Sequence, residues 1–133
     1  MRGRAYDSAM STQAATTRRS ALTLWLPVVV WAAVIFAFSS LPSLGTGLGG
    51  WDLVLRKLAH LSEYALLGLL LARAVRRPAL AVALAAAYAV TDELHQAFVE
   101  GRHGAPLDVG IDTLGALVGV LVWSRWSRWS RRA

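Results

Sequence analysis

Four apolar stretches, separated by short polar segments, make up most of the chain. They cover Leu22 to Phe38, about Asp52 to Val75, Ala79 to about Val99, and Leu107 to Trp123. A helix rises about 1.5 Å per residue, so the shortest of these stretches span about 26 Å, at the short end of the range for a helix that crosses the roughly 30 Å hydrocarbon core of a bilayer. The pattern predicts an all-α fold, a four-helix transmembrane bundle formed by residues 21–123.

The composition agrees with a membrane protein. Apolar residues make up 56% of the chain and the mean hydropathy is +0.46, which is above the usual range for a soluble domain. Cysteine is absent, so disulfides and thiolate chemistry are excluded. The chain has the length of one small domain.

The N-terminal segment, residues 1–20, is polar and rich in Ser, Thr and Ala, and we expect it to be a disordered cytoplasmic segment. Arg18 and Arg19 precede the first apolar stretch, as basic residues do in a signal peptide. That stretch is longer than the roughly 7–15 residues of a signal-peptide core, and no convincing cleavage site follows it. We therefore expect a retained transmembrane helix.

The C-terminal segment, residues 124–133, repeats Arg-Trp-Ser and is expected to be a basic, Trp-rich cytoplasmic tail. A helix here would place its tryptophans roughly opposite its arginines, which suits a helix lying on a membrane surface. A stop-transfer tail with an aromatic belt explains the same residues. Both interpretations stay open at this point.

The formal net charge of +6 is less informative than its distribution. No nucleic-acid motif accompanies the basic residues, so no nucleic-acid partner is expected. With four spans, most of the arginines fall on one side of the membrane, and the positive-inside rule then puts both termini in the cytoplasm. These are Arg2, Arg4, Arg18, Arg19, Arg73, Arg76, Arg77, Arg125, Arg128, Arg131 and Arg132.

Most of the acidic residues fall toward the opposite, outer side. Glu63, Asp92 and Asp112 lie about 16–20 Å from the cytoplasmic ends of their helices, which is nearly the same depth. Ionisable residues inside a membrane are costly and mark functional sites by default. Agreement in depth between three segments predicts a shared polar cavity in the outer half of the bilayer.

Helical spacing groups these residues on particular faces. Lys57, His60 and Glu63 follow one side of the second stretch, and Asp92, His95 and Gln96 share a face of the third. In the fourth stretch, one stripe contains Asp108, Asp112, Gly115 and Gly119. The two glycines form a GxxxG pair, which favours close packing against another helix.

Three segments carry a resemblance to a known family. They are FSSLP (38–42), KLAHLSEYALLG (57–68) and TDELHQAFVEGRHGAPLDVGIDTLGALVG (91–119). With these motifs the chain resembles the VanZ-like family of small bacterial membrane proteins. One departure is Glu100, where the family often has proline before Gly-Arg.

The resemblance implies a four-helix integral membrane domain that crosses the bacterial cytoplasmic (inner) membrane several times. The family's founding member is linked to resistance to the glycopeptide antibiotic teicoplanin, which implies a role in the cell envelope. Fold-level analogy is weak evidence for function, so the reaction, if any, is not implied.

The polar residues divide into two sets of candidates. General acid–base catalysis would use histidines beside carboxylates, here His60, Glu63, Asp92, Glu93 and His95. Binding of a phosphate or carboxylate would use Lys57, Gln96, Arg102, Asp108 and Asp112. We also expect Arg102 to form an ion pair with an acidic residue of the third or fourth helix.

These candidates support several hypotheses. The first is a site that binds or modifies the anionic headgroup of a membrane lipid or a lipid-linked cell-wall precursor, and so affects glycopeptide susceptibility. The alternative is a non-catalytic structural or interaction protein whose polar cluster is a stabilising network. A small transporter is a third, which no repeat symmetry or broken helix supports. A metal site is a narrower option, with ligands drawn from His60, Glu63, Glu93, His95 and Asp112.

Overall fold

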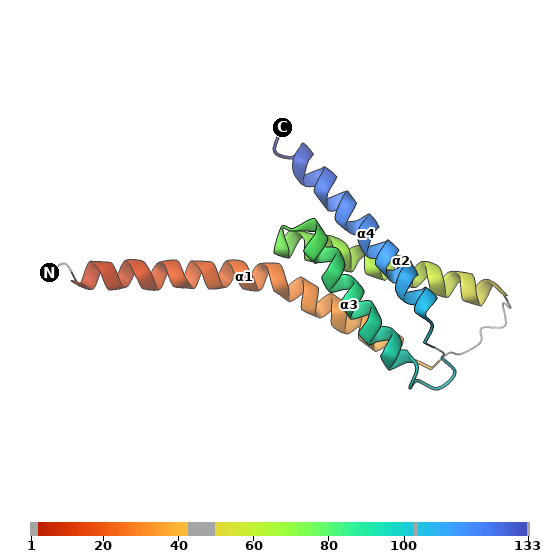
Figure 1. The fold of residues 1–133 in the computed structure, drawn as a ribbon. Coiled ribbons are helices and arrows are strands. Elements are labelled where there is room, and N and C mark those ends of the chain that lie inside the picture. The colour runs from red at the N-terminus through yellow and green to blue at the C-terminus, as the bar shows by residue number, and fades with distance from the viewer. Residues whose placement is uncertain (1–2, 43–49, 103, 133) are drawn as a thin grey trace.

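The fold consists of helices joined by short connections. The computed structural model describes the backbone of residues 3–42, 50–102 and 104–132, and the side chains from residue 21 onward. Its elements are α1 (Gly3–Ser39), α2 (Gly50–Val75), α3 (Pro78–Gln96) and α4 (Pro106–Trp129) (Figure 1). In the described ranges there is no strand, and the predicted all-α bundle is confirmed.

Among the described residues, three helices are long and apolar enough to cross a membrane. They are the segment Ala21–Ser39 of α1, then α2 and α4. Large apolar side chains point outward from them, among them Val29, Leu53 and Leu121. Such a surface suits lipid and not water. The chain is therefore a membrane protein.

Helix α3 differs from the four-span expectation, because it is not among the helices that qualify as membrane spans. Its last turns contain Asp92 and Glu93, and most of its apolar residues are alanines. Three of these, Ala81, Ala85 and Ala89, are fully buried at intervals of one helical turn. Packing in the bundle, more than hydropathy, therefore holds α3 in place.

Two helix boundaries differ from the sequence expectation. The bounds of α1 begin at Gly3, within residues 1–20, whose expected disorder stays a prediction. That stretch contains several alanines and, after Gly3, no glycine or proline, so nothing in its sequence breaks a helix. Helix α3 ends at Gln96 and not near Val99.

Helix α4 continues without a break to Trp129, through most of the segment expected to be a separate tail. Neither glycine nor proline follows Gly119, so the helix has no reason to end at Trp123. The rings of Trp123 and Trp126 pack together, with 5.1 Å between their centroids. The helical form of the Arg-Trp-Ser repeat is therefore the one that the structure shows.

Close packing of α2 against α4 is the main contact of the bundle. A β-carbon built on Gly115 would overlap the carbonyl oxygen of Leu61, and one built on Gly119 would overlap that of Ala65. The contact is reciprocal, since a β-carbon on Gly68 of α2 would overlap the carbonyl oxygen of Ala116. Glycine at these places lets the two backbones touch, as the GxxxG pair predicted.

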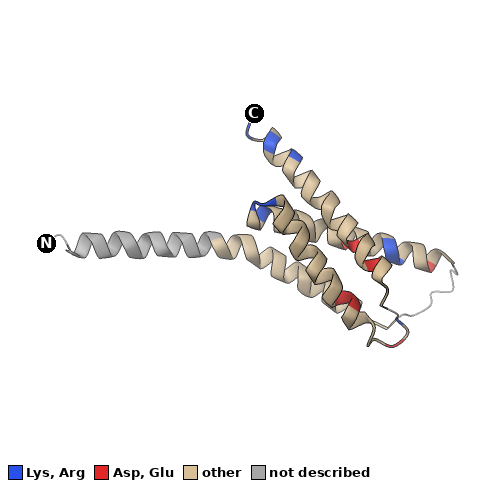
Figure 2. Cartoon of the chain, in the orientation of Figure 1, with Lys and Arg blue, Asp and Glu red and all other residues tan. Residues whose placement is uncertain are grey.

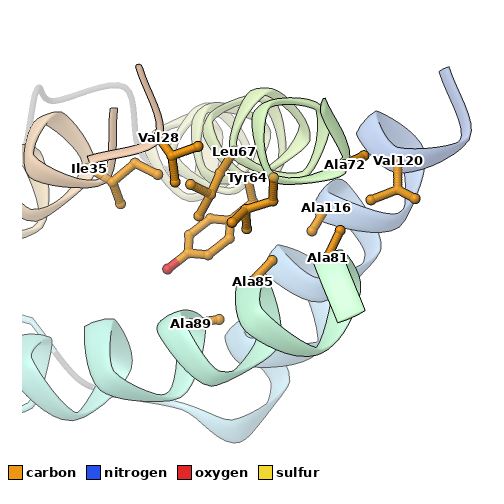
Figure 3. Close-up of a cluster of buried hydrophobic side chains, with 11 residues drawn as sticks. Val28, Ile35, Tyr64, Leu67, Ala72, Ala81, Ala85, Ala89, Ala116 and Val120 are labelled. Atoms are coloured by element: carbon orange, nitrogen blue, oxygen red, sulfur yellow. The ribbon is translucent and has the colours of Figure 1, made fainter. Parts of the chain in front are cut away.

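The apolar core lies between the four helices and is small. Tyr64 lies in the middle of the cluster in Figure 3, near the alanines of α3, and is fully buried. Ile35 of α1 and Val120 of α4 close the cluster from the other helices. Alanines are five of the eleven buried apolar residues of the cluster, on α2, α3 and α4, and their small size favours close approach of these helices.

Charge is unevenly distributed along the bundle. Figure 2 shows most of the acidic residues of α2, α3 and α4 toward the end that carries the α3–α4 turn. Arginines of the α2–α3 turn and of the C-terminal part of α4 lie at the other end, where they line a common groove: Arg73, Arg76, Arg128 and Arg131. The polar candidates are thus collected at one end of the molecule.

The glycine contact yields a direct test of the packing. Gly119→Ala should destabilise the fold by about 1–3 kcal/mol, because the added methyl group must push α4 away from α2. Gly110→Ala is the matched control, since a β-carbon on Gly110 of the same helix meets nothing within 4 Å. Thermal melting of the purified variants in detergent measures both. Equal melting temperatures for the two variants would contradict the described contact.

Candidate functional site

A pocket of about 180 Å³ opens at the acidic end of the bundle, where α2 and α4 begin and α3 ends. Many of the predicted site residues line it: Lys57, His60, Glu93, Gln96, Arg102, Asp108 and Asp112. Arg56 also lines it, although sequence reasoning did not select that residue. Its position next to Lys57 in the sequence could have identified it as a candidate.

The buried Asp92 of α3 is hydrogen-bonded to α1. The Ser39 hydroxyl donates a 2.9 Å hydrogen bond to its Oδ2 atom, and the Gln96 amide donates to the same oxygen at 3.1 Å. Its other oxygen, Oδ1, has no hydrogen-bond partner among the described residues, although only 2% of the residue is exposed. One oxygen of Asp92 is therefore held in place and the other is left unsatisfied.

Arg102 holds the C-terminal end of α1. Its Nη1 donates to Gln96 Oε1 at 3.1 Å, while Nε and Nη2 each donate at 2.9 Å to the carbonyls of Leu41 and Phe38. Phe38 is in the last turn of α1 and its carbonyl also accepts from the Leu41 N–H, while Leu41 follows the helix, so the guanidinium joins the end of α1 to the α3–α4 turn. Instead of the expected ion pair with an acid, Arg102 therefore bonds two carbonyls and one amide, and that prediction is wrong.

The guanidinium of Arg102 is partly removed from water. This burial lowers its pKa from the ordinary value, and the nearby Arg56 lowers the pKa further. Arginine titrates so far above neutral pH that the group stays charged. The pocket therefore keeps a fixed positive charge at its edge.

Lys57 forms an ion pair with Asp108 across the start of α2 and α4. Both side chains are about one-third exposed, so the pair contributes modestly to stability. Asp108 also lies in the first turn of α4, where a negative charge favours the helix dipole. Two predicted ligand-binding residues are thus paired with each other.

Glu93 ties α3 to the start of α4. Its Oε2 accepts a 2.9 Å hydrogen bond from the backbone N–H of Ala105, the residue that caps α4. Gly104 allows the close turn, because a β-carbon there would lie 2.6 Å from the Glu93 carbonyl oxygen. One oxygen of the Glu93 carboxylate therefore accepts a hydrogen bond that joins two structural elements.

His60 and Asp112 meet at the α2–α4 contact, with 3.4 Å between His60 Nδ1 and Asp112 Oδ1. Asp112 is fully buried, yet neither of its oxygens forms a hydrogen bond in the described residues, and His60 Nδ1 forms none. One ligand-type atom from each of His60, Asp92 and Asp112 lies within 4.8 Å of the others. These three residues, called the buried triad below, are the described group whose atoms could hold a metal ion.

Two predicted catalytic residues lie elsewhere. His95 faces α1, where its Nε2 lies 3.0 Å from Ser40 Oγ and its ring stacks on Phe36 with 4.4 Å between centroids. Glu63 is half-buried, and its backbone carbonyl accepts a 2.9 Å hydrogen bond from Trp31 Nε1. Neither lines the pocket or joins the buried triad.

Sequence reasoning missed Ser39 and Tyr64 as members of the polar centre. Ser39 is fully buried and bonds Asp92, and its signal was a polar residue in the last turn of an otherwise apolar helix. The Tyr64 hydroxyl is buried and unpartnered in the described residues, although tyrosine there was expected to be a packing residue. Its place one residue after Glu63, in the polar half of α2, was the available signal.

The sequence model of the VanZ/LLP1 family matches residues 5–127, which is most of the chain. This match confirms the resemblance drawn from the three sequence segments. No curated protein and no solved structure matches the chain.

The hydrogen bonds of Arg102 predict its main effect on stability. Arg102→Ala should lower the unfolding free energy by about 1–3 kcal/mol, because the three hydrogen bonds from the guanidinium to Gln96 Oε1 and to the carbonyls of Phe38 and Leu41 are lost. Arg102→Lys should recover little of it, since one ammonium cannot reproduce the planar fork of donors. Thermal melting in detergent measures the loss. Arg132→Ala, which removes an exposed arginine from the C-terminal end, is the control; an equal shift there would contradict the assigned role.

Proposed function

Because the chain is a membrane protein that belongs to the VanZ/LLP1 family, we propose that its pocket binds an anionic headgroup. The ligand would be the phosphate group of a membrane lipid or of a lipid-linked cell-wall precursor. The protein would act as a multi-pass protein of the bacterial cytoplasmic membrane, with its pocket at the outer leaflet. Binding or modification of that lipid would then change the susceptibility of the cell to glycopeptides.

The observation that carries this proposal is the set of cations around one cavity. Arg56, Lys57 and Arg102 all line it. Guanidinium and ammonium groups are the usual partners of phosphate, and a partly dry cavity strengthens such bonds. Two of the lining acids have partners of their own, since Asp108 pairs with Lys57 and Glu93 bonds the Ala105 N–H.

The size of the pocket favours a headgroup over a whole ligand. Its volume, about 180 Å³, is below the roughly 300–1,000 Å³ of sites that enclose a drug-sized molecule. Acyl or prenyl chains would then remain outside, along the apolar surface of the bundle. Leu53 of α2 and Leu107 of α4 provide such a surface beside the pocket, with 55% and 70% of their areas exposed.

A non-catalytic structural role is the second candidate, and specific contacts favour it. Arg102 bonds the end of α1, Lys57 pairs with Asp108, and Glu93 accepts from the Ala105 N–H before α4. Each contact ties two elements together without any ligand. On this hypothesis the cations neutralise or satisfy the fold, and a change to them alters stability and not binding.

Lipid binding by the purified protein separates the two candidates. The full chain, reconstituted in nanodiscs, is titrated with a labelled polyprenyl phosphate, and separately with a phosphatidylglycerol. Arg56→Gln should weaken binding of the preferred lipid at least about tenfold, the loss expected for one charge-assisted hydrogen bond of roughly 1.5–3 kcal/mol. Its melting temperature is measured alongside, so that a loss of stability is separated from a loss of binding.

Arg125→Gln is the matched control, because Arg125 is exposed on α4 near the opposite end. Unchanged binding in Arg56→Gln, with a lower melting temperature, would favour the structural candidate. Incubation of the same lipids with the protein, followed by mass spectrometry, distinguishes modification from binding alone. Teicoplanin susceptibility of cells carrying Arg56→Gln or Arg125→Gln then relates the pocket to the envelope.

The proposed orientation has its own test. The sequence has no cysteine, so a single introduced cysteine reports its own location. Glu100→Cys, in the exposed α3–α4 turn, should react with an impermeant thiol reagent in intact cells. Ser130→Cys, exposed at the end of α4, should react only after the membrane is opened. The reverse pattern would put the pocket on the cytoplasmic face and exclude the outer-leaflet proposal.

A further inference from the structure

The buried triad contains more unsatisfied polar atoms than any other described part of the chain. Asp112 is fully buried and Asp92 is 2% exposed. Both oxygens of Asp112, Oδ1 of Asp92 and Nδ1 of His60 lack a hydrogen-bond partner in the described residues. The three residues stand on α2, α3 and α4, and one ligand-type atom from each lies within 4.8 Å of the others.

Such an arrangement is costly without a cation. An ionised carboxylate removed from water costs several kcal/mol in a real protein unless it is paired or coordinates a metal. The hydrogen bonds that Asp92 does accept come from neutral groups, Ser39 and Gln96. Asp112 has His60 as its ion-pair neighbour among the described residues, and that imidazole carries a charge only when it is protonated. One imidazole cannot balance two carboxylates.

We propose that His60, Asp92 and Asp112 bind one divalent transition-metal ion. His60 would contribute Nδ1, Asp92 its Oδ1 and Asp112 one or both carboxylate oxygens. The 3.4 Å between His60 Nδ1 and Asp112 Oδ1 suits this role, because two ligands about 2.1 Å from a tetrahedral ion lie roughly 3.4 Å apart. The triad differs from the sequence-based option by including Asp92 and leaving out Glu63, Glu93 and His95.

The donor set indicates the class of ion. Imidazole nitrogen with carboxylate oxygens suits zinc, manganese or ferrous ions, whereas calcium and magnesium prefer oxygen alone. Protein ligands from three residues leave coordination positions open. His60 and Asp112 also line the pocket, so the triad lies against its wall. This metal site would stand whether or not the pocket binds a lipid headgroup.

The surroundings of Asp92 resemble the outer shell of a metal site. Ser39 and Gln96 both donate to Oδ2 and so fix the carboxylate with Oδ1 left over. Gln96 is itself oriented by Arg102 Nη1. Hydrogen bonds of this kind orient metal ligands, and their loss typically weakens metal binding 10–100-fold. Gln96→Ala should therefore weaken metal binding without removing a metal ligand.

The competing explanation is proton sharing, in which protonated carboxylates take the place of the ion. The number of metal ions bound per chain distinguishes a metal site from proton sharing. The full chain is purified in detergent, stripped with a chelator, incubated with Zn²⁺ or with Mn²⁺ alone, desalted and measured by elemental mass spectrometry. The expected result is about one ion per chain for at least one of the two metals, with a higher melting temperature than the stripped protein.

Asp112→Asn should weaken metal binding at least tenfold. Asp52→Asn is the control, because Asp52 lies in the first turn of α2, outside the triad and the pocket, and this variant should bind the metal as the unmodified protein does. In chelator, Asp112→Asn should melt no lower than the stripped protein, because it removes an unpaired buried charge. Retained one-to-one binding in Asp112→Asn, or failure of the unmodified protein to bind either metal, would overturn the site. If Asp112→Asn does not fold, the stoichiometry of the unmodified protein decides, with His60→Gln as the second ligand variant.

Retention of the metal by Arg56→Gln, whatever its lipid binding, keeps this result separate from the headgroup proposal. A protein that binds metal but no lipid leaves the triad intact as a site and removes the proposed ligand. A protein that binds lipid but neither metal removes the triad as a site and leaves the pocket. The two proposals therefore fail independently.

Discussion

The contact between the backbones of α2 and α4 sets the geometry of everything around it. Gly115 and Gly119 leave no β-carbon between α4 and the carbonyls of Leu61 and Ala65. Lipid chains are as apolar as the helices, so close van der Waals packing must replace the hydrophobic effect as the force that joins them. His60 precedes Leu61, and Asp112 lies one turn before Gly115. The same contact that holds the helices therefore brings the imidazole against the carboxylate.

The polar end of the bundle contains two kinds of groups, and the difference between them is informative. Arg102, Gln96, Glu93 and the pair of Lys57 and Asp108 have specific partners that tie one element to another. They account for the fold of the turns and helix ends. The buried triad, by contrast, concentrates atoms without partners at the centre of three helices. Because buried polar groups are normally satisfied, the unsatisfied centre points to a ligand and the satisfied edge to structure.

Several site residues could be predicted from the sequence because depth in a membrane follows from the rise of a helix. Asp92 and Asp112 were placed at similar depth by counting residues, and the structure brings both into the triad. The same reasoning included Glu63, and helical spacing added His95, but the structure places both near α1. Depth fixes position along the helix axis only. The rotation of each helix, which decides the partner that a side chain faces, depends on packing against the neighbours.

The sequence by itself determined the apolar helices, the membrane character, the glycine stripe and the family, because each is encoded in a local or contiguous pattern. Only the tertiary structure decided which polar atoms meet. The hydrogen bond from Ser39 to Asp92 joins residues 53 positions apart, and Arg102 reaches back to a carbonyl 64 positions earlier. The spacing of residues within one helix cannot specify pairs of residues that belong to different elements. They follow from the way α1 packs against α3, which is settled by the shapes of all the helices together.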